Sequence, residues 1–500
     1  MSTGHVDQLL LGIADAQVAT MPGVGRIVVS GLTLDSRQVQ RGDAFFALRG
    51  AHGHGIEFAA GAVRRGAQVV LAEAPAVDVA PLDVPVLWID GLHDQVGEIA
   101  ARFYDRPAES MRIIGITGTN GKTSCVQLLA QALTHLGHRA ATIGTLGAGL
   151  HGQLRDGDRT TPDAVTVQAL LADFRDASAS HVAMEVSSHA LKQGRVAAVD
   201  FEVAAFTNLT RDHLDYHGTM EAYGAAKAKL FAWPGLQTAV INIDDAFGAS
   251  LADRLPSGVR ALRVSMADAS EAEIAASGIV TSAEGLQFQL RTPWGMRRLG
   301  SHLLGRFNVA NLLTVAGCLG ALGESFERVV AALENLQPVN GRMSRLGGLH
   351  GLPLVVVDYA HTPDALEQAL TALRAHCAGR LICVFGCGGE RDAGKRPLMG
   401  AIAARLADVA IVTDDNPRGE DGDAIVAQIV ASMGAPSPTV ERDRAKAIGR
   451  ALKLAQSGDV VLIAGKGHET YQDGATGKHP FDDLAVAHAA LERMAREPRA

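Results

Sequence analysis

The chain has 500 residues, of which 47% are hydrophobic, 20% charged and 4% aromatic. This composition is typical of a globular protein and excludes a disordered or fibrous one. At roughly 150 residues per domain, the length predicts about three domains. The formal net charge of −8 excludes an overall basic field for nucleic acid or an anionic membrane, and the scarcity of aromatic residues argues against stacking on single-stranded nucleic acid.

The N-terminus and the cysteines predict a cytoplasmic location. The first residues contain no basic stretch followed by an apolar core, and no apolar run is long enough to cross a bilayer. The five cysteines are odd in number and mostly scattered, which is typical of reduced thiols rather than a disulfide framework. We therefore expect a soluble, multidomain protein without membrane insertion.

The first part of the chain, residues 1–97, is predicted to form a small α/β domain. Short strand-like runs at residues 69–72 and 84–89 alternate with glycine-rich turns. A helix with one apolar face is predicted at residues 94–103 and leads into the next domain.

The middle of the chain, residues 98–337, alternates strand, turn and helix. A helix is predicted at residues 123–136, with Gly137 as its C-cap. The predicted buried strands cover residues 111–117, 140–144, 181–186, 204–209 and 238–243. Such alternation predicts a mainly parallel sheet with helices on both faces.

A second boundary is predicted near residues 337–341, so that residues 338–500 form the third domain. Helical stretches there separate predicted strands at residues 354–359, 381–386, 409–413 and 460–464. This pattern predicts a doubly wound, Rossmann-like sheet, and the fold class is therefore three α/β domains. In open sheets of this kind ligands bind beyond the carboxyl ends of the strands, so motifs at those ends carry the most functional information.

A glycine-rich segment between a strand and a helix predicts a nucleoside-triphosphate site. It reads Gly115-Ile-Thr-Gly-Thr-Asn-Gly-Lys-Thr123. Backbone N–H groups and the helix N-terminus can bind a phosphate there, Lys122 can reach the β- and γ-phosphates, and Thr123 can hold Mg²⁺. The strict pattern has glycine where this chain has Ile116, so a chance Gly-Lys-Thr in a turn is the alternative. The strand–turn–helix context favours the phosphate loop.

The loop Gly118-Thr-Asn-Gly-Lys-Thr123 resembles the phosphate loop of the Mur ligase family, ATP-dependent amide-forming enzymes of peptidoglycan precursor synthesis. The resemblance extends through all three domains. It is closest to the members that add meso-diaminopimelate to UDP-N-acetylmuramoyl-L-alanyl-D-glutamate. It implies that the N-terminal domain binds UDP, the central domain ATP and Mg²⁺, and the C-terminal domain the amino acid. The D-glutamate carboxylate would be activated as an acyl phosphate, which the amine then attacks.

The resemblance also implies a metal centre in the central domain. Thr123, Glu185 and His213 look like ligands of Mg²⁺, and Lys227 occupies the position of a carbamylated lysine that supports a second Mg²⁺. From the residues alone, Glu185 could be a satisfied strand-end carboxylate and Lys227 a solvated helix lysine. His213 and His217 are four residues apart and could suggest zinc on a helix, although the His-Glu-x-x-His pattern is absent.

Residues implied to bind ATP come from four segments. Asn308 follows Gly305-Arg-Phe, and its amide can read the edges of a base, although a helix N-cap is the alternative. Arg342 looks like a contact of the transferred phosphate, two residues before Ser344, where many relatives have glutamate. The implied ATP-binding residues are Gly118, Thr119, Asn120, Gly121, Lys122, Thr123, Ser124, Asn308, Asn311, Arg342 and Asp358. The implied catalytic residues are Lys122, Lys227, His213 and Arg342.

The sugar-nucleotide contacts implied by the resemblance lie in turns that composition alone would not identify. Hydroxyl and amide side chains with one arginine suit a muramoyl-dipeptide. A plain surface loop is the alternative for Thr160 and Thr161. The implied residues are Leu34, Ser36, Ala51, His52, Gly53, Thr160, Thr161, Ser187, Gln193 and Arg195.

The segment Asp414-Asp-Asn-Pro-Arg418 predicts the amino-acid specificity. A guanidinium can bind the second carboxylate of meso-diaminopimelate in a bidentate manner, whereas lysine has no such carboxylate. Arg391 looks like a further carboxylate clamp, beside Glu390, where many relatives have aspartate. A β-turn and surface ion pairs are the alternatives. The implied diaminopimelate-binding residues are Arg391, Asp415, Asn416, Pro417, Arg418, Gly465 and Glu469.

Three other functions remain open at this point. A lysine-adding ligase of the same family is disfavoured by Arg418. A folylpolyglutamate-type ligase shares the phosphate loop but lacks a UDP-binding N-terminal domain. A non-synthetic ATPase would leave Arg391, Arg418 and Glu469 without a role. We expect a monomer that acts on small molecules, with Mg²⁺ as cofactor and ATP as co-substrate.

Overall fold

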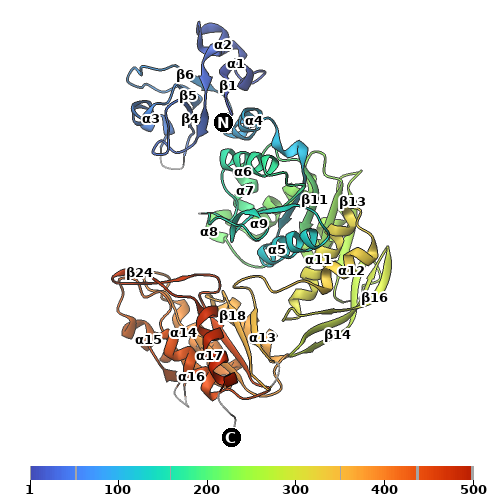
Figure 1. The fold of residues 1–500 in the computed structure, drawn as a ribbon. Coiled ribbons are helices and arrows are strands. Elements are labelled where there is room, and N and C mark those ends of the chain that lie inside the picture. The colour runs from blue at the N-terminus through green and yellow to red at the C-terminus, as the bar shows by residue number, and fades with distance from the viewer. Residues whose placement is uncertain are drawn as a thin grey trace. The chain divides into compact units, whose positions relative to one another are not determined.

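The fold is described from a computed structural model, which covers residues 2–50, 53–157, 159–267, 269–348, 351–434 and 438–496. The chain divides into two compact units. The first contains Met1–Val264 and Gly317–Glu324, and the second contains Ser265–Ala316 and Ser325–Ala500 (Figure 1).

The N-terminal part of the first unit is a small parallel sheet in the order β3-β4-β5-β6. Its strands are β3 (Gly31–Thr33), β4 (Asp43–Ala47), β5 (Val69–Glu73) and β6 (Val86–Ile89). The helices around it are α1 (Val6–Leu9), α2 (Asp15–Thr20), α3 (Ala59–Arg65) and α4 (Leu92–Phe103). Every residue of β4 is buried, which explains its continuous apolar run. The predicted N-terminal α/β layer is confirmed.

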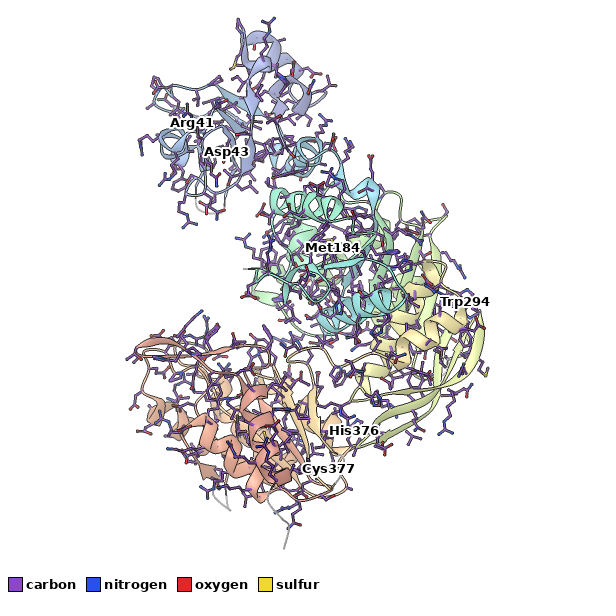
Figure 2. The ribbon with its side chains drawn as sticks, viewed as in Figure 1. Arg41, Asp43, Met184, Trp294, His376 and Cys377 are labelled. Atoms are coloured by element: carbon purple, nitrogen blue, oxygen red, sulfur yellow. The ribbon has the colours of Figure 1, made fainter. Side chains whose placement is uncertain are left out.

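The rest of the first unit is built on strands in the order β13-β12-β11-β7-β10-β8-β9, all parallel except for the β8–β9 pair. The strands are β7 (Arg112–Thr117), β8 (Ala140–Gly144), β9 (Gly147–Leu150), β10 (His181–Glu185), β11 (Phe201–Phe206), β12 (Thr238–Asn242) and β13 (Arg260–Ser265). The helices are α5 (Lys122–His135), α6 (Ala164–Asp176), α7 (Ser188–Lys192), α8 (Leu214–His217), α9 (Met220–Ala228) and α10 (Ala246–Ala252). Met184 of β10 is fully buried in this core (Figure 2).

One strand of this sheet lies earlier in the chain than predicted. The sequence pattern predicts a strand at residues 204–209, but β11 ends at Phe206. Thr207 and Asn208 leave the strand because they hydrogen-bond to the phosphate loop: the Thr207 hydroxyl donates to the Asn120 carbonyl at 2.6 Å, and the Thr119 N–H donates to the Asn208 carbonyl at 2.8 Å.

The second unit begins with an antiparallel meander that the sequence analysis does not predict. It consists of β14 (Ile274–Ser282), β15 (Gly285–Thr292) and β16 (Gly295–Ser301). Helix α11 (Phe307–Ala321) and helix α12 (Phe326–Glu334) follow it. His376 joins this region to the C-terminal domain, because its Nδ1 lies 2.6 Å from the Ser282 carbonyl and its Nε2 accepts from the Gly305 N–H at 2.9 Å (Figure 2).

The C-terminal domain is a six-stranded sheet in the order β17-β18-β22-β19-β20-β21, parallel except at β17. Its strands are β17 (Ser344–Gly347), β18 (Leu354–Asp358), β19 (Leu381–Phe385), β20 (Val409–Val412), β21 (Thr439–Val440) and β22 (Val460–Ala464), and a hairpin of β23 (Tyr471–Gly474) and β24 (Gly477–Pro480) follows. The helices are α13 (Pro363–Arg374), α14 (Lys395–Leu406), α15 (Gly422–Val430), α16 (Arg444–Leu454) and α17 (Asp483–Arg496). The first three helices and the last two pack in separate cores, as the predicted doubly wound fold requires.

All five cysteines are free thiols. Cys125, Cys318, Cys383 and Cys387 are buried, and Cys377 is half-buried. Burial raises the pKa of the thiols of Cys318, Cys383 and Cys387 to about 12. A search of the described helices finds none that is both long and apolar enough to span a membrane.

Candidate active site

The phosphate loop connects β7 to α5 in the first unit, and its shape depends on glycine. Gly118 has φ +150°, and a Cβ atom there would lie 1.9 Å from the Thr207 hydroxyl oxygen. Gly121 has φ +86° and forms the N-cap of α5. The Asn120 N–H donates to the Asn208 side-chain oxygen at 2.9 Å. The end of β11 therefore fixes the loop from the side, in a conformation that only glycine adopts without strain.

Lys122 lies over this loop. Its ammonium group donates to the carbonyl oxygens of Gly118 and Thr119, each at 2.9 Å. The cation is thus held at the helix N-terminus, where the partial positive charge of α5 also favours an anion.

Glu185 lies at the carboxyl end of β10 and is 1% exposed. Its Oε2 accepts from the Thr123 hydroxyl at 3.1 Å and from the Thr145 hydroxyl at 3.3 Å, and its Oε1 accepts from the Thr145 N–H at 2.8 Å. The structure thus brings the predicted pair Thr123 and Glu185 into contact. Only neutral donors hydrogen-bond to this carboxylate in the described part of the chain, and oxygen atoms of this kind are the ligands that Mg²⁺ prefers.

Lys227 of α9 is 1% exposed, whereas Lys229 is exposed. The Lys227 ammonium donates to the Gly118 carbonyl at 2.8 Å and lies 4.4 Å from the centroid of the Tyr223 ring. Burial, together with the nearby charge of Lys122, lowers the pKa of Lys227 to about 6. Lys227 is therefore not the solvated helix lysine that its sequence context also allowed.

His213 stands just before α8, with φ +52° and a half-exposed side chain. Its ring centroid lies 4.8 Å from that of His189 and 6.1 Å from that of Tyr223. His217 is buried and shares a 3.0 Å hydrogen bond with the Ser188 hydroxyl. Across the residues that the structure describes, no three His, Cys, Asp or Glu side chains form a group that could hold a metal ion.

Part of the predicted sugar-nucleotide site lines a cavity of about 1220 Å³ in the first unit. Leu34, Ser36 and Gly53 border it, together with Arg37, Arg155 and Arg159. Ala51 and His52 lie outside the described residues. Three arginines at a large cavity suit a phosphorylated ligand.

The remaining predicted dipeptide contacts form one hydrogen-bonded cluster. The Arg195 guanidinium donates to the Thr161 carbonyl and to the Gln193 side-chain oxygen, in each case at 2.9 Å. The Ser187 N–H donates to the Thr161 hydroxyl at 3.1 Å, and that hydroxyl donates to the Glu185 carbonyl at 2.7 Å. Thr161 is 1% exposed and so does not belong to a surface loop. The Thr160 hydroxyl lies 3.0 Å from that of Thr145.

In the second unit, Asn308 and Asn311 lie on the first turns of α11. The helix begins at Phe307, so Asn308 is inside it and is not its N-cap. The Asn308 amide donates to the Leu304 carbonyl at 2.7 Å, and the Asn311 amide donates to the Asn308 side-chain oxygen at 2.7 Å. Both asparagines are buried and mutually oriented.

Arg342 and Asp358 flank the start of the C-terminal domain. The Met343 N–H donates to the Asp358 carboxylate at 2.8 Å, and desolvation raises the pKa of Asp358. The Arg342 guanidinium lies 5.1 Å from the Tyr359 ring centroid, and its buried Nε has no hydrogen-bond partner within the described residues. Ser344 accepts from the Gly341 N–H at 2.9 Å and donates to the Val339 carbonyl at 3.1 Å, so it stabilises this turn.

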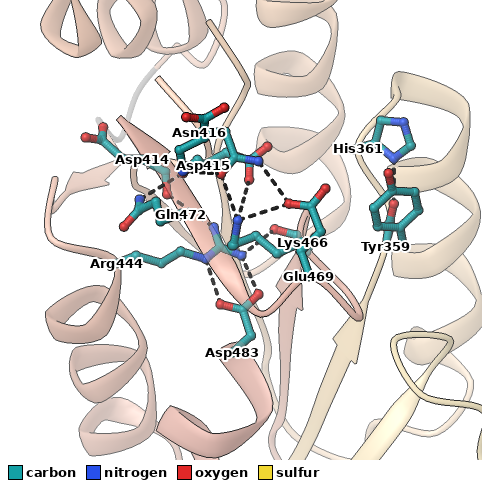
Figure 3. A network of polar contacts seen from close by, with 12 residues as sticks. Tyr359, His361, Asp414, Asp415, Asn416, Arg444, Lys466, Glu469, Gln472 and Asp483 are labelled. Carbon is teal, nitrogen blue, oxygen red and sulfur yellow. Dashed lines mark hydrogen bonds and ion pairs between the residues drawn. The ribbon is translucent and has the colours of Figure 1, made fainter. Parts of the chain in front are cut away.

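The ends of β20 and β22 bring together Asp415, Asn416, Lys466 and Glu469, which we call the strand-end cluster (Figure 3). The Asn416 amide donates to Glu469 Oε2 at 2.9 Å. The Lys466 ammonium donates to Asn416 Oδ1 at 2.8 Å and to Glu469 Oε2 at 3.1 Å. Glu469 is thus partly buried and pairs with the buried Lys466, so it does not form the surface ion pair that was the alternative. Lys466 is fully buried, and the sequence analysis assigned it no role.

Arg418 and Arg391 lie close to this cluster. Arg418 has φ +53°; its guanidinium donates to the Gly389 carbonyl at 2.7 Å and its Nε lies 3.6 Å from an oxygen of Asp473. Both arginines also border Gly388: a Cβ built there would lie 3.1 Å from Arg418 Nη1 and 3.8 Å from Arg391 Cγ. Arg391 is exposed and forms no ion pair with any described residue. Two guanidinium groups therefore lie next to the strand-end cluster, that of Arg418 beside Asp473 and that of Arg391 exposed.

The backbone beneath the cluster is held by a fully buried ion pair. Arg444 donates to both carboxylate oxygens of Asp483 at 2.7 Å, and also to the Ala464 carbonyl at 3.0 Å (Figure 3). Gly465, with φ +123°, follows at once, and its N–H donates to the Asp358 carbonyl at 3.1 Å. The strand end that carries Lys466 is thus rigidly attached to the domain core.

Family models match most of the chain. They are the Mur ligase family, catalytic domain, at residues 28–104, the Mur ligase middle domain at residues 116–319, and the Mur ligase, glutamate ligase domain at residues 341–467. The chain therefore belongs to the Mur ligase family, and its fold is the three-domain architecture of that family.

Individual relatives are more specific. The chain is 57% identical over 466 residues to the UDP-N-acetylmuramoyl-L-alanyl-D-glutamate–2,6-diaminopimelate ligase of Xanthomonas campestris pv. campestris, covering 93% of this chain and 94% of the relative. It is 51% identical to the enzyme of the same name from Pseudomonas aeruginosa, covering 93% and 95%. A solved structure of a ligase of that name superimposes with a TM-score of 0.76 at 36% identity, covering 99% of this chain and all of the other. A folylpolyglutamate synthase of Mycobacterium tuberculosis shares the fold, with a TM-score of 0.59 at 18% identity over 81% of this chain and 95% of that one.

Proposed function

We propose that the protein joins meso-2,6-diaminopimelate to the D-glutamate of UDP-N-acetylmuramoyl-L-alanyl-D-glutamate, with hydrolysis of ATP to ADP and phosphate. The observation that carries this proposal is the pair of guanidinium groups, Arg418 and Arg391, beside the strand-end cluster, because this set matches a ligand with both ammonium and carboxylate groups. The names of the relatives support the same substrates.

The reaction has two balanced steps. The D-glutamate carboxylate attacks the γ-phosphorus of ATP, so that an acyl phosphate forms and ADP leaves. An amine of diaminopimelate then attacks the acyl carbon, the C–O bond to phosphate breaks, and the amine loses a proton as the amide forms. Both steps bring anions together, and cationic side chains are needed to offset the repulsion. Lys122 on the phosphate loop and Arg342 are suited to this task.

The central domain also has donors that fit Mg²⁺. The Thr123 hydroxyl and the Glu185 carboxylate are in contact and offer oxygen atoms, and we propose that they and His213 hold the ion. When bound, Mg²⁺ would neutralise phosphate charge during transfer. Thr145 and Thr123 orient the Glu185 carboxylate through three hydrogen bonds, so this side chain is fixed before any ligand arrives.

We propose that Lys227 carries a carbamate and supports a second Mg²⁺. Its side chain is buried against the Gly118 carbonyl and the Tyr223 ring, and it forms no ion pair with any described residue. A buried lysine without a carboxylate partner is costly to charge, and reaction of its amine with CO₂ converts it into an anion suited to a cation site. The exposed Lys229 has no such environment.

The remaining predicted contacts belong to the same proposal. The phosphate loop residues Gly118 to Ser124, with Asn308, Asn311, Arg342 and Asp358, would bind ATP. The cavity at Leu34, Ser36 and Gly53 would bind UDP, and the cluster of Thr160, Thr161, Ser187, Gln193 and Arg195 the muramoyl-dipeptide. We propose that the three domains cover residues 1–97, 98–337 and 338–500. We also propose that the protein acts in the cytoplasm as a monomer.

The experiment that tests this function measures phosphate release by the purified protein with ATP, Mg²⁺ and UDP-N-acetylmuramoyl-L-alanyl-D-glutamate. Meso-diaminopimelate and L-lysine are supplied in parallel, and mass spectrometry identifies the products. We expect a tripeptide product in the assay with meso-diaminopimelate and none in the assay with L-lysine. If L-lysine were used equally well, the protein would still be a ligase but the proposed specificity for diaminopimelate would be rejected. Phosphate release with no new amide would reject the ligase function.

A further inference from the structure

We infer that Lys466 is a positioning residue for the amino-acid substrate: it holds Asp415, Asn416 and Glu469 in the arrangement that receives the ammonium group of that substrate. This inference rests on the proposed function, because it takes diaminopimelate as the ligand. Lys466 itself cannot touch a ligand, since its side chain is fully buried, whereas those of Asp415 and Glu469 are 11% and 19% exposed.

The contacts of Lys466 reach all three of these residues. Its ammonium group lies 2.8 Å from Asn416 Oδ1, 3.1 Å from Glu469 Oε2 and 4.0 Å from Asp415 Oδ1 (Figure 3). Asn416 connects them further, because its amide donates to the same Glu469 oxygen and its Oδ1 accepts from the Asp473 N–H at 2.9 Å. One cation therefore organises two carboxylates and an amide.

The charge of the cluster fits one ammonium ligand. Two carboxylates and one lysine leave a net charge of one negative unit, which a single substrate ammonium would neutralise. Without Lys466, the Asp415 and Glu469 carboxylates would have no lysine ammonium between them, and mutual repulsion would drive them apart.

One oxygen of the cluster lacks a hydrogen-bond donor within the described part of the chain. The buried Asp415 Oδ1 has no hydrogen-bond partner among the described residues, and a buried acceptor of this kind is costly unless something donates to it. Lys466 lies at 4.0 Å, too far for a hydrogen bond but close enough to attract the charge. A substrate ammonium can approach the exposed parts of the Asp415 and Glu469 side chains, while Lys466 holds Glu469 through Oε2.

The test compares Lys466→Met with Lys478→Met. Lys478 is the matched control, because both lysines lie near the same ring: the Lys478 ammonium is 4.0 Å and the Lys466 ammonium 5.5 Å from the Tyr471 ring centroid. Unlike Lys466, Lys478 is exposed and contacts none of Asp415, Asn416 and Glu469. For Lys466→Met we expect the KM for meso-diaminopimelate to rise about 30-fold, since one partner of a buried charge pair is removed. The KM values for ATP and for the UDP-dipeptide should stay within about twofold and kcat within about threefold, because those ligands make no use of the cluster.

Each other outcome has a defined meaning. An unchanged KM for diaminopimelate, or an equal rise in all three KM values, would overturn the inference. If the Met variant fails to unfold cooperatively on heating, Lys466→Gln, which keeps a hydrogen-bond donor without the charge, replaces it with an expected rise of about tenfold. Loss of folding in both variants would assign Lys466 a structural role instead. If the unmodified protein forms no amide with diaminopimelate, the proposed function fails, and this result is separate from any effect of the variants.

Discussion

The Lys227 ammonium donates a 2.8 Å hydrogen bond to the carbonyl of Gly118, the residue at which the phosphate loop begins to turn. A side chain from α9 is thus in direct contact with the loop that would bind ATP. The contact lies inside the domain, since Lys227 is almost wholly buried. A change in the charge of Lys227 would therefore change the electrostatic potential at the phosphate loop.

Replacing Lys227 with methionine should reduce amide formation at least 100-fold, because the proposed carbamate and its cation site are lost together. Removal of CO₂ and bicarbonate from the unmodified protein should lower its activity, and added bicarbonate should restore it. The assay is phosphate release at fixed ATP and Mg²⁺. Lys229→Met is the matched control and should keep its activity, since Lys229 is exposed. Full activity of the Lys227 variant would reject the carbamate.

Gly118→Ala should abolish nucleotide binding. The new Cβ would lie 1.9 Å from the Thr207 hydroxyl oxygen and 3.1 Å from the Asn208 backbone nitrogen, so the loop or the end of β11 has to move. Isothermal titration with ADP checks this result. Gly137→Ala serves as the control: it also has positive φ, but its Cβ meets open space, so it should cost about 1 kcal/mol of stability and leave nucleotide binding intact. Normal ADP binding by the Gly118 variant would mean that the loop adopts another shape.

Arg418→Lys should raise the KM for meso-diaminopimelate about 100-fold or more, because lysine cannot replace the planar fork of hydrogen-bond donors. Steady-state kinetics with all three substrates measures the effect. Arg405→Lys provides the control, since Arg405 forms an exposed ion pair with Glu367 and should leave every KM unchanged. If Arg418→Lys left the KM for meso-diaminopimelate unchanged, a residue other than Arg418 would have to bind the second carboxylate of the substrate.

His181 should make the first unit less stable in mild acid. It is 5% exposed, and burial, with the nearby His138 and Arg112, lowers the pKa of His181 from 6.5 to about 4. The neutral form is therefore favoured on folding, and its stabilisation is complete above pH 6.5 and declines as the pH falls towards 4. Between pH 7 and pH 5 we expect a loss of about 2 kcal/mol.

Urea unfolding at both pH values measures this loss in the unmodified protein and in His181→Gln. In the variant, the free energy of unfolding should fall less between pH 7 and pH 5, and the difference from the unmodified protein should be about 2 kcal/mol, because glutamine does not titrate. His488→Gln, at an exposed position on α17, should behave like the unmodified protein. Identical pH slopes for all three proteins would show that His181 is not the group responsible.

The strands of the parallel sheets could be predicted from the sequence because they are buried on both faces. β8, β19 and β22 consist entirely of buried residues, so their apolar runs stand out between glycine-rich turns. The meander β14–β16 was missed. Its alternating exposed residues and its charged segment Gly295–Ser301 give no continuous apolar run, and its pairing depends on contacts between neighbouring hairpins.

The candidate site, too, contains some contacts that could be predicted from the sequence and others that could not. The contact of Thr123 with Glu185 follows from two motifs at the ends of adjacent strands, β7 and β10. The part played by Lys466 could not be read from the sequence, because a lysine between two glycines is usually exposed, and only the fold reveals its burial against Asn416 and Glu469. Its one signal was its place directly after a buried strand, in a segment that already contained two predicted contacts.

The five free cysteines have a practical consequence for experiments on this molecule. Because four thiols are buried and desolvation raises the pKa of each of the five, very little thiolate is present at neutral pH. The unmodified chain should therefore react slowly with maleimides. A single cysteine introduced on the surface of each unit would be labelled selectively, and a donor and acceptor dye attached in this way would report on motion between the units during turnover.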